Sequence, residues 1–267
     1  MTIAIGFICT DGIVLAADRM EYRGVHKVEV KKIVMRKYGK LSISLAGAGD
    51  GELIEQFFAE VAEEMIRPLA RRTLKKIIQS ATKKMFDQNI KPLGKEDYDR
   101  FMMVRFLIAA SHSGQSLLYA AGPVQKCRAI GEIHRYHHTI GIGQYAADPL
   151  LGNIHSERLS MLETATIAAY ILKRVKEQSP DCGGPSDIVL HGSDGTIKAF
   201  WPEWGSYTTT KQREEWSESI NLAFGKLIQA AARNHNASID KGLEELRKYA
   251  TNVPTGDPDD LWDGPKK

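Results

Sequence analysis

Long apolar segments are missing from this sequence. A helix that crosses a bilayer needs about 20 consecutive apolar residues, whereas the apolar stretch at residues 3–17 is interrupted by Gly6, Thr10 and Asp11. The apolar start MTIAIGFIC follows no Lys or Arg and precedes no small-residue cleavage site, which argues against a signal peptide. We therefore expect no membrane partner and interpret the first segment as a β-strand.

Cysteine and charge of one sign are also scarce. The 267 residues include three cysteines, which are widely spaced and odd in number: Cys9, Cys127 and Cys182. Such a set is typical of a reducing compartment and not of a disulfide framework, so we expect a cytoplasmic protein. Because 36 Lys and Arg are balanced by 33 Asp and Glu, composition gives no reason to expect a nucleic-acid partner.

The sequence carries no convincing metal or phosphate motif. His134, His137 and His138 are close in sequence, but their segment is typical of a strand and turn and has no matching Cys or acidic partner. The glycine-rich segment at residues 47–51 lacks the Gly-Lys-Ser/Thr ending of a phosphate-binding loop. We expect no metal and no other cofactor.

The pattern of the first fifty residues indicates a sheet. Residues 2–9 and 13–17 are apolar and flank a Thr-Asp-Gly turn, which predicts a β-hairpin. Residues 25–36 alternate between apolar and polar side chains, and residues 41–46 resume after a glycine-containing break. Two further strands are therefore predicted.

Helical periodicity alternates with strand patterns along the next 150 residues. Apolar side chains recur on one helical face in residues 53–65, 74–85 and 159–178, whereas residues 102–110, 116–121, 126–133 and 187–200 are typical of strands. This order predicts an α+β fold, a four-layer αββα sandwich in which two antiparallel sheets lie between helix layers.

The sandwich accounts for only part of the chain. We expect one domain over residues 2–200, appended helices over residues 201–253 and a disordered tail over residues 254–267. The appended region contains Trp201, Trp204 and Trp216 and could form a subunit contact.

Thr2 is placed for nucleophilic chemistry. A threonine hydroxyl is a weak nucleophile unless a base takes its proton, and a chain-terminal α-amine with a pKa of about 8 can serve as that base. Removal of Met1 would expose this amine, and Thr2 is a small residue of the kind that such removal tolerates. The sequence therefore predicts a nucleophile that carries its own general base.

Several segments resemble the catalytic β subunits of the 20S proteasome and the related bacterial ring protease. TIAIGFICTDGIVLAADR at residues 2–19 is similar to the opening hairpin of that family, VKKI at residues 30–33 to its lysine-bearing stretch, and SLAG at residues 44–47 to its glycine-ended strand. The ordered combination, over about residues 2–200, is specific. It implies an N-terminal-nucleophile (Ntn) hydrolase fold and a threonine-type peptidase that acts on peptides or unfolded proteins.

The resemblance also implies roles for individual residues. Asp18 would be the catalytic acid, and Lys32, chosen over Lys31 by strand register, the catalytic lysine. The lysine would lower the pKa of the amine and hydroxyl of Thr2, while Asp18 would hold the ammonium in place. The backbone N–H of Gly47 would line the oxyanion hole. Leu45 would line the substrate pocket and favour an apolar side chain there.

The chain departs from the family pattern in three places. The stretch from Gly24 to Lys32 is about two residues shorter than the usual family spacing. Gly141-Ile142-Gly143 stands where the family commonly has a serine between two glycines, and the later Asp and Ser pair matches Ser179, Asp181 and Cys182 only with a shift. We carry Asp181 forward as a candidate site residue.

The resemblance also concerns assembly, and it leaves two other functions open. The resemblance implies a homo-oligomer in the form of a ring or barrel, and leaves an ATPase partner open. A small-molecule amidase of the same fold and a non-catalytic assembly subunit stay as alternatives, because fold alone does not fix function.

Overall fold

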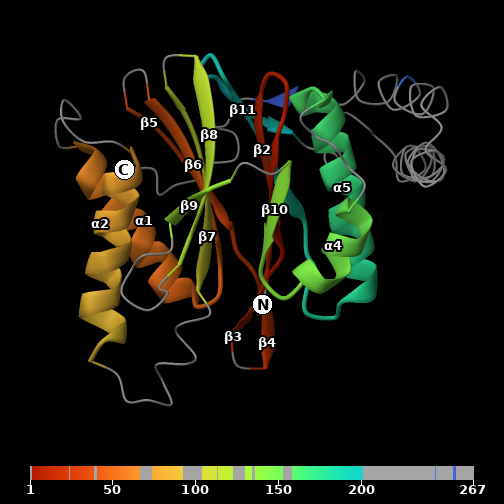
Figure 1. Cartoon of the computed structure of the whole chain (residues 1–267). Helices are drawn as coiled ribbons and strands as arrows, with labels where there is room; N and C mark the ends of the chain where they lie inside the picture. Colours follow the sequence, from red (N-terminus) through yellow and green to blue (C-terminus); the bar gives the residue numbers. More distant parts are fainter. Residues whose placement is uncertain are drawn as a thin grey trace.

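The computed structural model confirms the predicted α+β sandwich. Figure 1 shows four layers, with a helix pair, two sheets and a second helix pair stacked side by side. The structure describes residues 2–23, 25–38, 41–66, 74–92, 104–112, 114–122, 130–133, 136–152, 158–200, 244 and 255–256.

The first sheet has six strands and contains both the earliest and the latest strands of the chain. Its spatial order is β10 (His137–Ile140), β1 (Ala4–Ile8), β2 (Gly12–Asp18), β11 (Ser186–Gly192), β12 (Ile197–Phe200) and β13 (Thr255–Gly256). Every neighbouring pair is antiparallel.

The second sheet is a meander whose five strands follow the chain order. It consists of β5 (Ile33–Tyr38), β6 (Leu41–Ala48), β7 (Arg105–His112), β8 (Gln115–Ala121) and β9 (Ile130–Glu132), and all its pairs are antiparallel. Strand β5 forms one edge of this sheet.

Helices cover the outer face of each sheet. The second sheet packs against α1 (Gly51–Ile66) and α2 (Leu74–Met85), which continues into the π-helical turn η2 (Phe86–Ile90). The first sheet packs against α4 (Gln144–Leu151) and α5 (Met161–Gln178). Because both faces of the central strands are covered, β2, β6 and β11 are buried along their whole length.

Local chemistry explains where the two long helices begin. Asp50 accepts hydrogen bonds from the backbone N–H groups of Glu52 and Leu53 at the start of α1. Ser160 and Glu163 form a reciprocal capping box at the start of α5, which satisfies amide groups that have no partner within the helix.

Small side chains allow the two sheets to approach closely. The layer between them includes Ala4, Ala17, Ala46 and Ala109. A Cβ on Gly6 of β1 would come within 2.9 Å of Leu118 Cδ1 on the facing sheet. Glycine at this position therefore sets the distance between the sheets.

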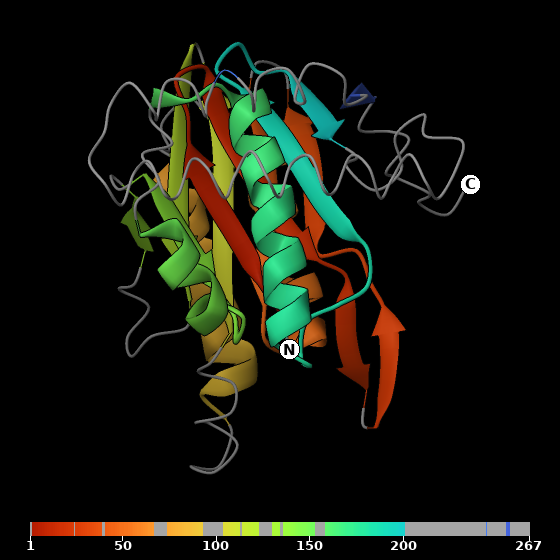
Figure 2. The same ribbon diagram turned by 90° about the vertical axis from the view of Figure 1, so that its right-hand side faces the viewer.

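A two-stranded hairpin, β3 (Met20–Arg23) and β4 (His26–Glu29), extends beyond the sandwich (Figures 1 and 2). The sequence predicted one strand over residues 25–36, and this prediction is wrong. The alternating pattern continues across residues 30–32, but the chain leaves the hairpin there and enters β5, so periodicity alone could not place the break.

The sequence also missed helix α4, which is short and contains Pro149. The predicted appended helices over residues 201–253 lie outside the described residues, apart from Glu244. Of residues 254–267 the structure describes Thr255 and Gly256, which pair with β12. The predicted domain bounds are therefore not tested and stay predictions.

Candidate active site

Thr2 lies just before β1 and is held through its backbone. Its carbonyl accepts a hydrogen bond from Gly143 N at 3.3 Å. The next residue, Ile3, donates its N–H to Asp18 Oδ1 at 3.1 Å. Thr2 is buried within the chain, yet it lines a cavity. These contacts fix the position from which its side chain meets that cavity.

Gly141 makes the close approach to Thr2 possible. Its φ angle is +92°, and a Cβ built on it would lie 2.1 Å from the Thr2 carbonyl oxygen. No other residue type fits such a position without strain. Ile142, which replaces the serine of the family pattern, is 42% exposed.

Asp18 and Lys32 form a buried ion pair at the same end of the sandwich. Lys32 Nζ lies 2.7 Å from Asp18 Oδ1 and also donates to the Met20 carbonyl. Asp18 Oδ2 accepts a hydrogen bond from Gly183 N at 3.0 Å. Asp18 is 0% and Lys32 6% exposed. Because the local dielectric is low, each hydrogen bond of the pair is stronger than it would be in water.

Burial shapes the acid–base behaviour of this pair. Loss of water around the ammonium lowers the pKa of Lys32, while the Asp18 carboxylate opposes the shift through its charge and its hydrogen bond. Burial therefore disfavours the charged form of Lys32, and the fixed carboxylate of Asp18 favours it.

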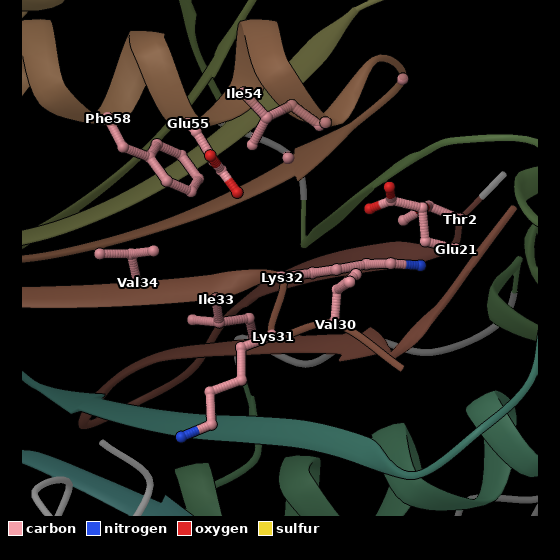
Figure 3. A pocket seen from close by; sticks show the side chains of 13 residues that line it. Thr2, Glu21, Val30, Lys31, Lys32, Ile33, Val34, Ile54, Glu55 and Phe58 are labelled. Carbon is pink, nitrogen blue, oxygen red and sulfur yellow. The ribbon is translucent and has the colours of Figure 1, made fainter. Parts of the chain in front are cut away.

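The two neighbouring lysines point in different directions. Figure 3 shows the Lys32 side chain running toward the end of the cavity that holds Thr2 and Glu21, whereas the Lys31 ammonium lies on the opposite side of the strand. Of the two candidates it is thus Lys32 that the fold places beside Asp18.

The cavity next to Thr2 has a volume of about 240 Å³. It lies between the chain segment that enters β5 and the first turns of α1 (Figure 3). Its walls are formed by Thr2, Glu21, Val30, Lys31, Lys32, Ile33, Val34, Gly47, Gly49, Gly51, Ile54, Glu55 and Phe58.

Gly47 borders the cavity at the end of a strand ladder. On one side it pairs with Phe106 of β7. On the other side the ladder to β5 stops at the pair of Ile33 and Ala46, so this edge of Gly47 has no ladder partner in β5. A Cβ on Gly47 would lie 2.5 Å from Ile54 Cγ2. Packing against α1 therefore requires glycine here, whatever its chemical role.

Leu45 lies next to this cavity and not on its wall. It lines a second hollow of about 280 Å³ that shares Val34, Glu55 and Phe58 with the first. The reason is the strand period, since Leu45 and Gly47 share the face of β6 that packs on α1 but stand one step apart. Its predicted role in substrate binding stays a prediction.

Asp181 makes no hydrogen bond or ion pair with the described residues around Thr2. Its neighbour Cys182 is buried nearer to the centre, where burial raises the pKa of the thiol and the charges of Asp18 and Lys32 act on it in opposite directions. Cys182 N donates to the Ser179 carbonyl at 3.2 Å. The turn thus presents Cys182 and the Gly183 amide to the centre.

Sequence reasoning named Thr2, Asp18, Lys32 and Gly47, and the structure brings these four together at one end of the sandwich. It missed the supporting groups, which are the amides of Gly143 and Gly183, the Met20 carbonyl and the Glu21 side chain. The sequence signal for these amides was a pair of nearby glycines in each segment, Gly141 with Gly143 and Gly183 with Gly184. Glycine marks positions where the backbone is approached closely.

The described residues contain no group of three or more His, Cys, Asp or Glu side chains that could hold a metal ion. None of the helices in the described part of the chain is long and apolar enough to span a membrane. Cys9 and Cys182 both carry free, buried thiols.

Comparison with family models gave no match, and comparison with curated protein sequences gave none either. Comparison with solved structures gave clear likenesses. Anbu from Hyphomicrobium sp. strain MC1 matches with a TM-score of 0.64 at 17% identity, over 84% of this chain and 97% of that chain. Anbu from Yersinia bercovieri, described as the ancestral beta-subunit, matches with a TM-score of 0.66 at 12% identity, over 84% and 96%.

A third structure, the helical assembly of the Anbu complex from Pseudomonas aeruginosa, matches with a TM-score of 0.65 at 15% identity, over 82% of this chain and 94% of that chain. These likenesses correct the family resemblance inferred from the sequence, because these three structures are of Anbu, which is not a proteasome β subunit as such. The resemblance rested on short segments of the opening hairpin and two strands, and such segments could not distinguish proteins that share one fold. The chain has a proteasome-like Ntn fold.

Proposed function

We propose that this chain is an N-terminal threonine hydrolase that cleaves peptide bonds with Thr2 as its nucleophile. The observation that carries the proposal is the buried ion pair of Lys32 and Asp18 beside Thr2, at a cavity that Thr2 itself lines. A buried charge is costly to maintain, and a cation at this point favours formation of an alkoxide.

The proposed reaction starts once Met1 has been removed. The free α-amine of Thr2 takes the proton of the hydroxyl, and the oxygen attacks the substrate carbonyl. The resulting oxyanion lies near the open edge of Gly47, whose backbone N–H would stabilise it. The protonated amine then passes its proton to the leaving nitrogen, and an ester between the substrate and Thr2 remains. A water molecule gives a proton to the amine and attacks this ester, and the Thr2 oxygen takes the proton back as it leaves.

Each neighbouring residue has a defined part in this scheme. The positive charge of Lys32 lowers the pKa of the hydroxyl and of the amine, and Asp18 keeps that charge in position. Gly141 and Gly143 hold the backbone of Thr2 so that its oxygen stays at the cavity. Asp181 and Leu45 would act from the rim of this arrangement.

A missing hydroxyl favours one other function. Ile142 is exposed where a serine would help to bind the terminal amine, so a non-catalytic assembly subunit is the second candidate. Under that hypothesis Met1 would be retained and no peptide would be cleaved.

The test is intact-mass measurement combined with a peptide-hydrolysis assay. We expect the purified wild-type chain to lack Met1 and to cleave peptides, and the Thr2→Ala variant to be inactive while it stays folded by circular dichroism. Thr10→Ala, at the far end of β1, is the matched control and should keep its activity. Full hydrolysis by protein that retains Met1 would refute the mechanism.

We also propose that the chain assembles with copies of itself. Support comes from the Anbu structure described as a helical assembly and from the helix layers, which leave outward faces for subunit contacts. Sedimentation at micromolar concentration should give a species much larger than one chain of 29.7 kDa.

A further inference from the structure

The cavity beside Thr2 carries more charge than its role in the proposed chemistry needs. Glu21 from β3 and Glu55 from α1 both line it, together with Lys31 and Lys32. What a substrate side chain meets depends on which of these charges reach the open space.

The two lysines contribute little positive charge to the part of the cavity away from Thr2. The ammonium of Lys32 is buried against Asp18 and the Met20 carbonyl, so its charge acts at the Thr2 end. The Lys31 side chain points away to the other side of the strand (Figure 3). Neither lysine therefore presents its charge to the part of the cavity that lies away from Thr2.

The two carboxylates have the opposite orientation. In Figure 3 the Glu55 side chain points from α1 into the space above the strand that bears Lys32, and the Glu21 carboxylate stands beside Thr2 at the end of the same space. Glu21 also lies close to the first residue of α1, since a Cβ on Gly51 would be 3.2 Å from its Oε2. At the Thr2 end the charge of Glu21 acts on Lys32, so Glu55 is the carboxylate that faces the rest of the cavity.

The walls between these carboxylates are apolar. Val34, Ile54 and Phe58 face the cavity from β5 and α1 (Figure 3). Apolar walls that end in carboxylates fit a side chain with an aliphatic stem and a cationic head, which are the two parts of Lys and Arg. The carboxylates would repel an acidic side chain. A short apolar side chain would form no ion pair with them.

We propose that this cavity binds the side chain of a Lys or Arg residue that precedes the scissile bond, with Glu55 as the specificity-determining residue. The inference rests on the proposed function, because it assumes that the substrate carbonyl lies at Thr2. It replaces the apolar preference expected from Leu45, since Leu45 lines the neighbouring hollow and Glu55 lines both.

Binding to a variant that cannot turn over separates this inference from the proposed function. Labelled peptides of one common sequence, ending in Arg, Leu or Asp, would be titrated by fluorescence anisotropy into the full-length Thr2→Ala protein. We expect the Arg peptide to bind tightest. Adding Glu55→Gln should reduce the ratio of Arg to Leu affinity about fivefold, the value of one partly exposed ion pair.

Two further variants sharpen the result. Glu52→Gln removes the same charge from an exposed position one turn earlier in α1 that lines neither cavity, so it should leave the ratio unchanged. Glu55→Lys should reverse the preference toward the Asp peptide. Equal binding of the Arg and Leu peptides, or an equal effect of the two glutamine variants, would overturn the inference. Failure of the proposed function would look different, because the wild-type chain would bind the Arg peptide without cleaving it.

Discussion

Two buried polar clusters lie between the sheets, at opposite ends of the same strands, and they differ in charge and in access to a cavity. At one end, Asp18 of β2 and Lys32 are charged and adjoin a cavity. At the other end, His191 of β11 is neutral and enclosed, with its Nδ1 3.1 Å from Ser44 Oγ. Strand β2 joins the two, since Asp18 pairs with Ser186 and Ile13 with His191.

The difference between the clusters shows that burial of polar groups is not by itself a sign of function. In the enclosed cluster, Ser42 and Ser111 donate to the carbonyls of Gly195 and Gly192. These bonds hold the sheets together through a turn. In the open cluster the corresponding bonds orient a cation next to a hydroxyl. A neighbouring cavity and charged side chains therefore distinguish the cluster at Asp18 from the structural cluster at His191.

The largest effect is expected at the lysine. Lys32→Ala leaves Asp18 without its cation and removes the charge beside Thr2, so kcat/KM should fall by at least roughly 10³-fold in a peptide assay. Lys31→Ala is the matched control, because its side chain points away from Thr2, and it should retain most of the activity. Activity in Lys32→Ala with loss in Lys31→Ala would exchange the roles of the two lysines.

A smaller effect on rate, with a distinctive pH dependence, is expected for Asp18→Asn. The charge of Asp18 raises the pKa of Lys32 against the effect of burial. Without that charge the pKa of Lys32 falls further, so the ammonium is lost at lower pH.

The alkaline limb of the pH profile should therefore move to lower pH in Asp18→Asn, and kcat/KM at neutral pH should drop roughly 10²-fold. Asp187→Asn, which removes a carboxylate that pairs with Arg19 outside the cavity, should leave the alkaline limb unchanged. A limb that does not move in Asp18→Asn would show that Lys32 is not the group that titrates.

The enclosed cluster should affect stability and not rate. Burial lowers the pKa of His191 from 6.5 to about 4. Between pH 6.5 and about pH 4, His191 is protonated in the unfolded chain but not in the folded chain. The free energy of unfolding therefore decreases as the pH falls through this range. The free energy of unfolding should decrease by about 2 kcal/mol from this residue between pH 7.5 and pH 5.

Urea unfolding of the wild type and of His191→Leu at these two pH values measures this contribution as the difference in pH dependence. His26→Gln, at an exposed position in β4, is the control and should follow the wild type. If His191→Leu keeps the full pH dependence of the wild type, another group is responsible for the acid sensitivity.

The sequence predicted the parts of this molecule that depend on nearby residues. The apolar runs of β1 and β2, the Thr-Asp-Gly turn between them and the amphipathic pattern of α5 are local signals. Lys32 was chosen over Lys31 by strand register, and it lies beside Asp18 although residues 30–32 are outside the strands.

Contacts between distant segments could not be predicted in the same way. Gly143 contacts Thr2 and Gly183 contacts Asp18, although more than a hundred residues separate the members of each pair in the sequence. The residues next to each glycine in the sequence do not indicate its partner. The acidic character of the cavity was missed for the same reason. Glu21 belongs to a hairpin and Glu55 to a helix, and they share a cavity only because α1 packs over the entrance to β5.

The strand order of the first sheet has a consequence for biosynthesis. Strands β1 and β2 lie between β10 and β11, so the neighbours of the opening hairpin are made after all five strands of the second sheet, whose meander can close as it emerges. At about 5–20 residues per second, the ribosome needs on the order of ten to thirty seconds to extend the chain from Asp18 to its partner Ser186. During that interval Asp18 has no Gly183 amide and Thr2 no Gly143 amide, so a nascent chain carries the proposed nucleophile without the contacts that hold it at the cavity.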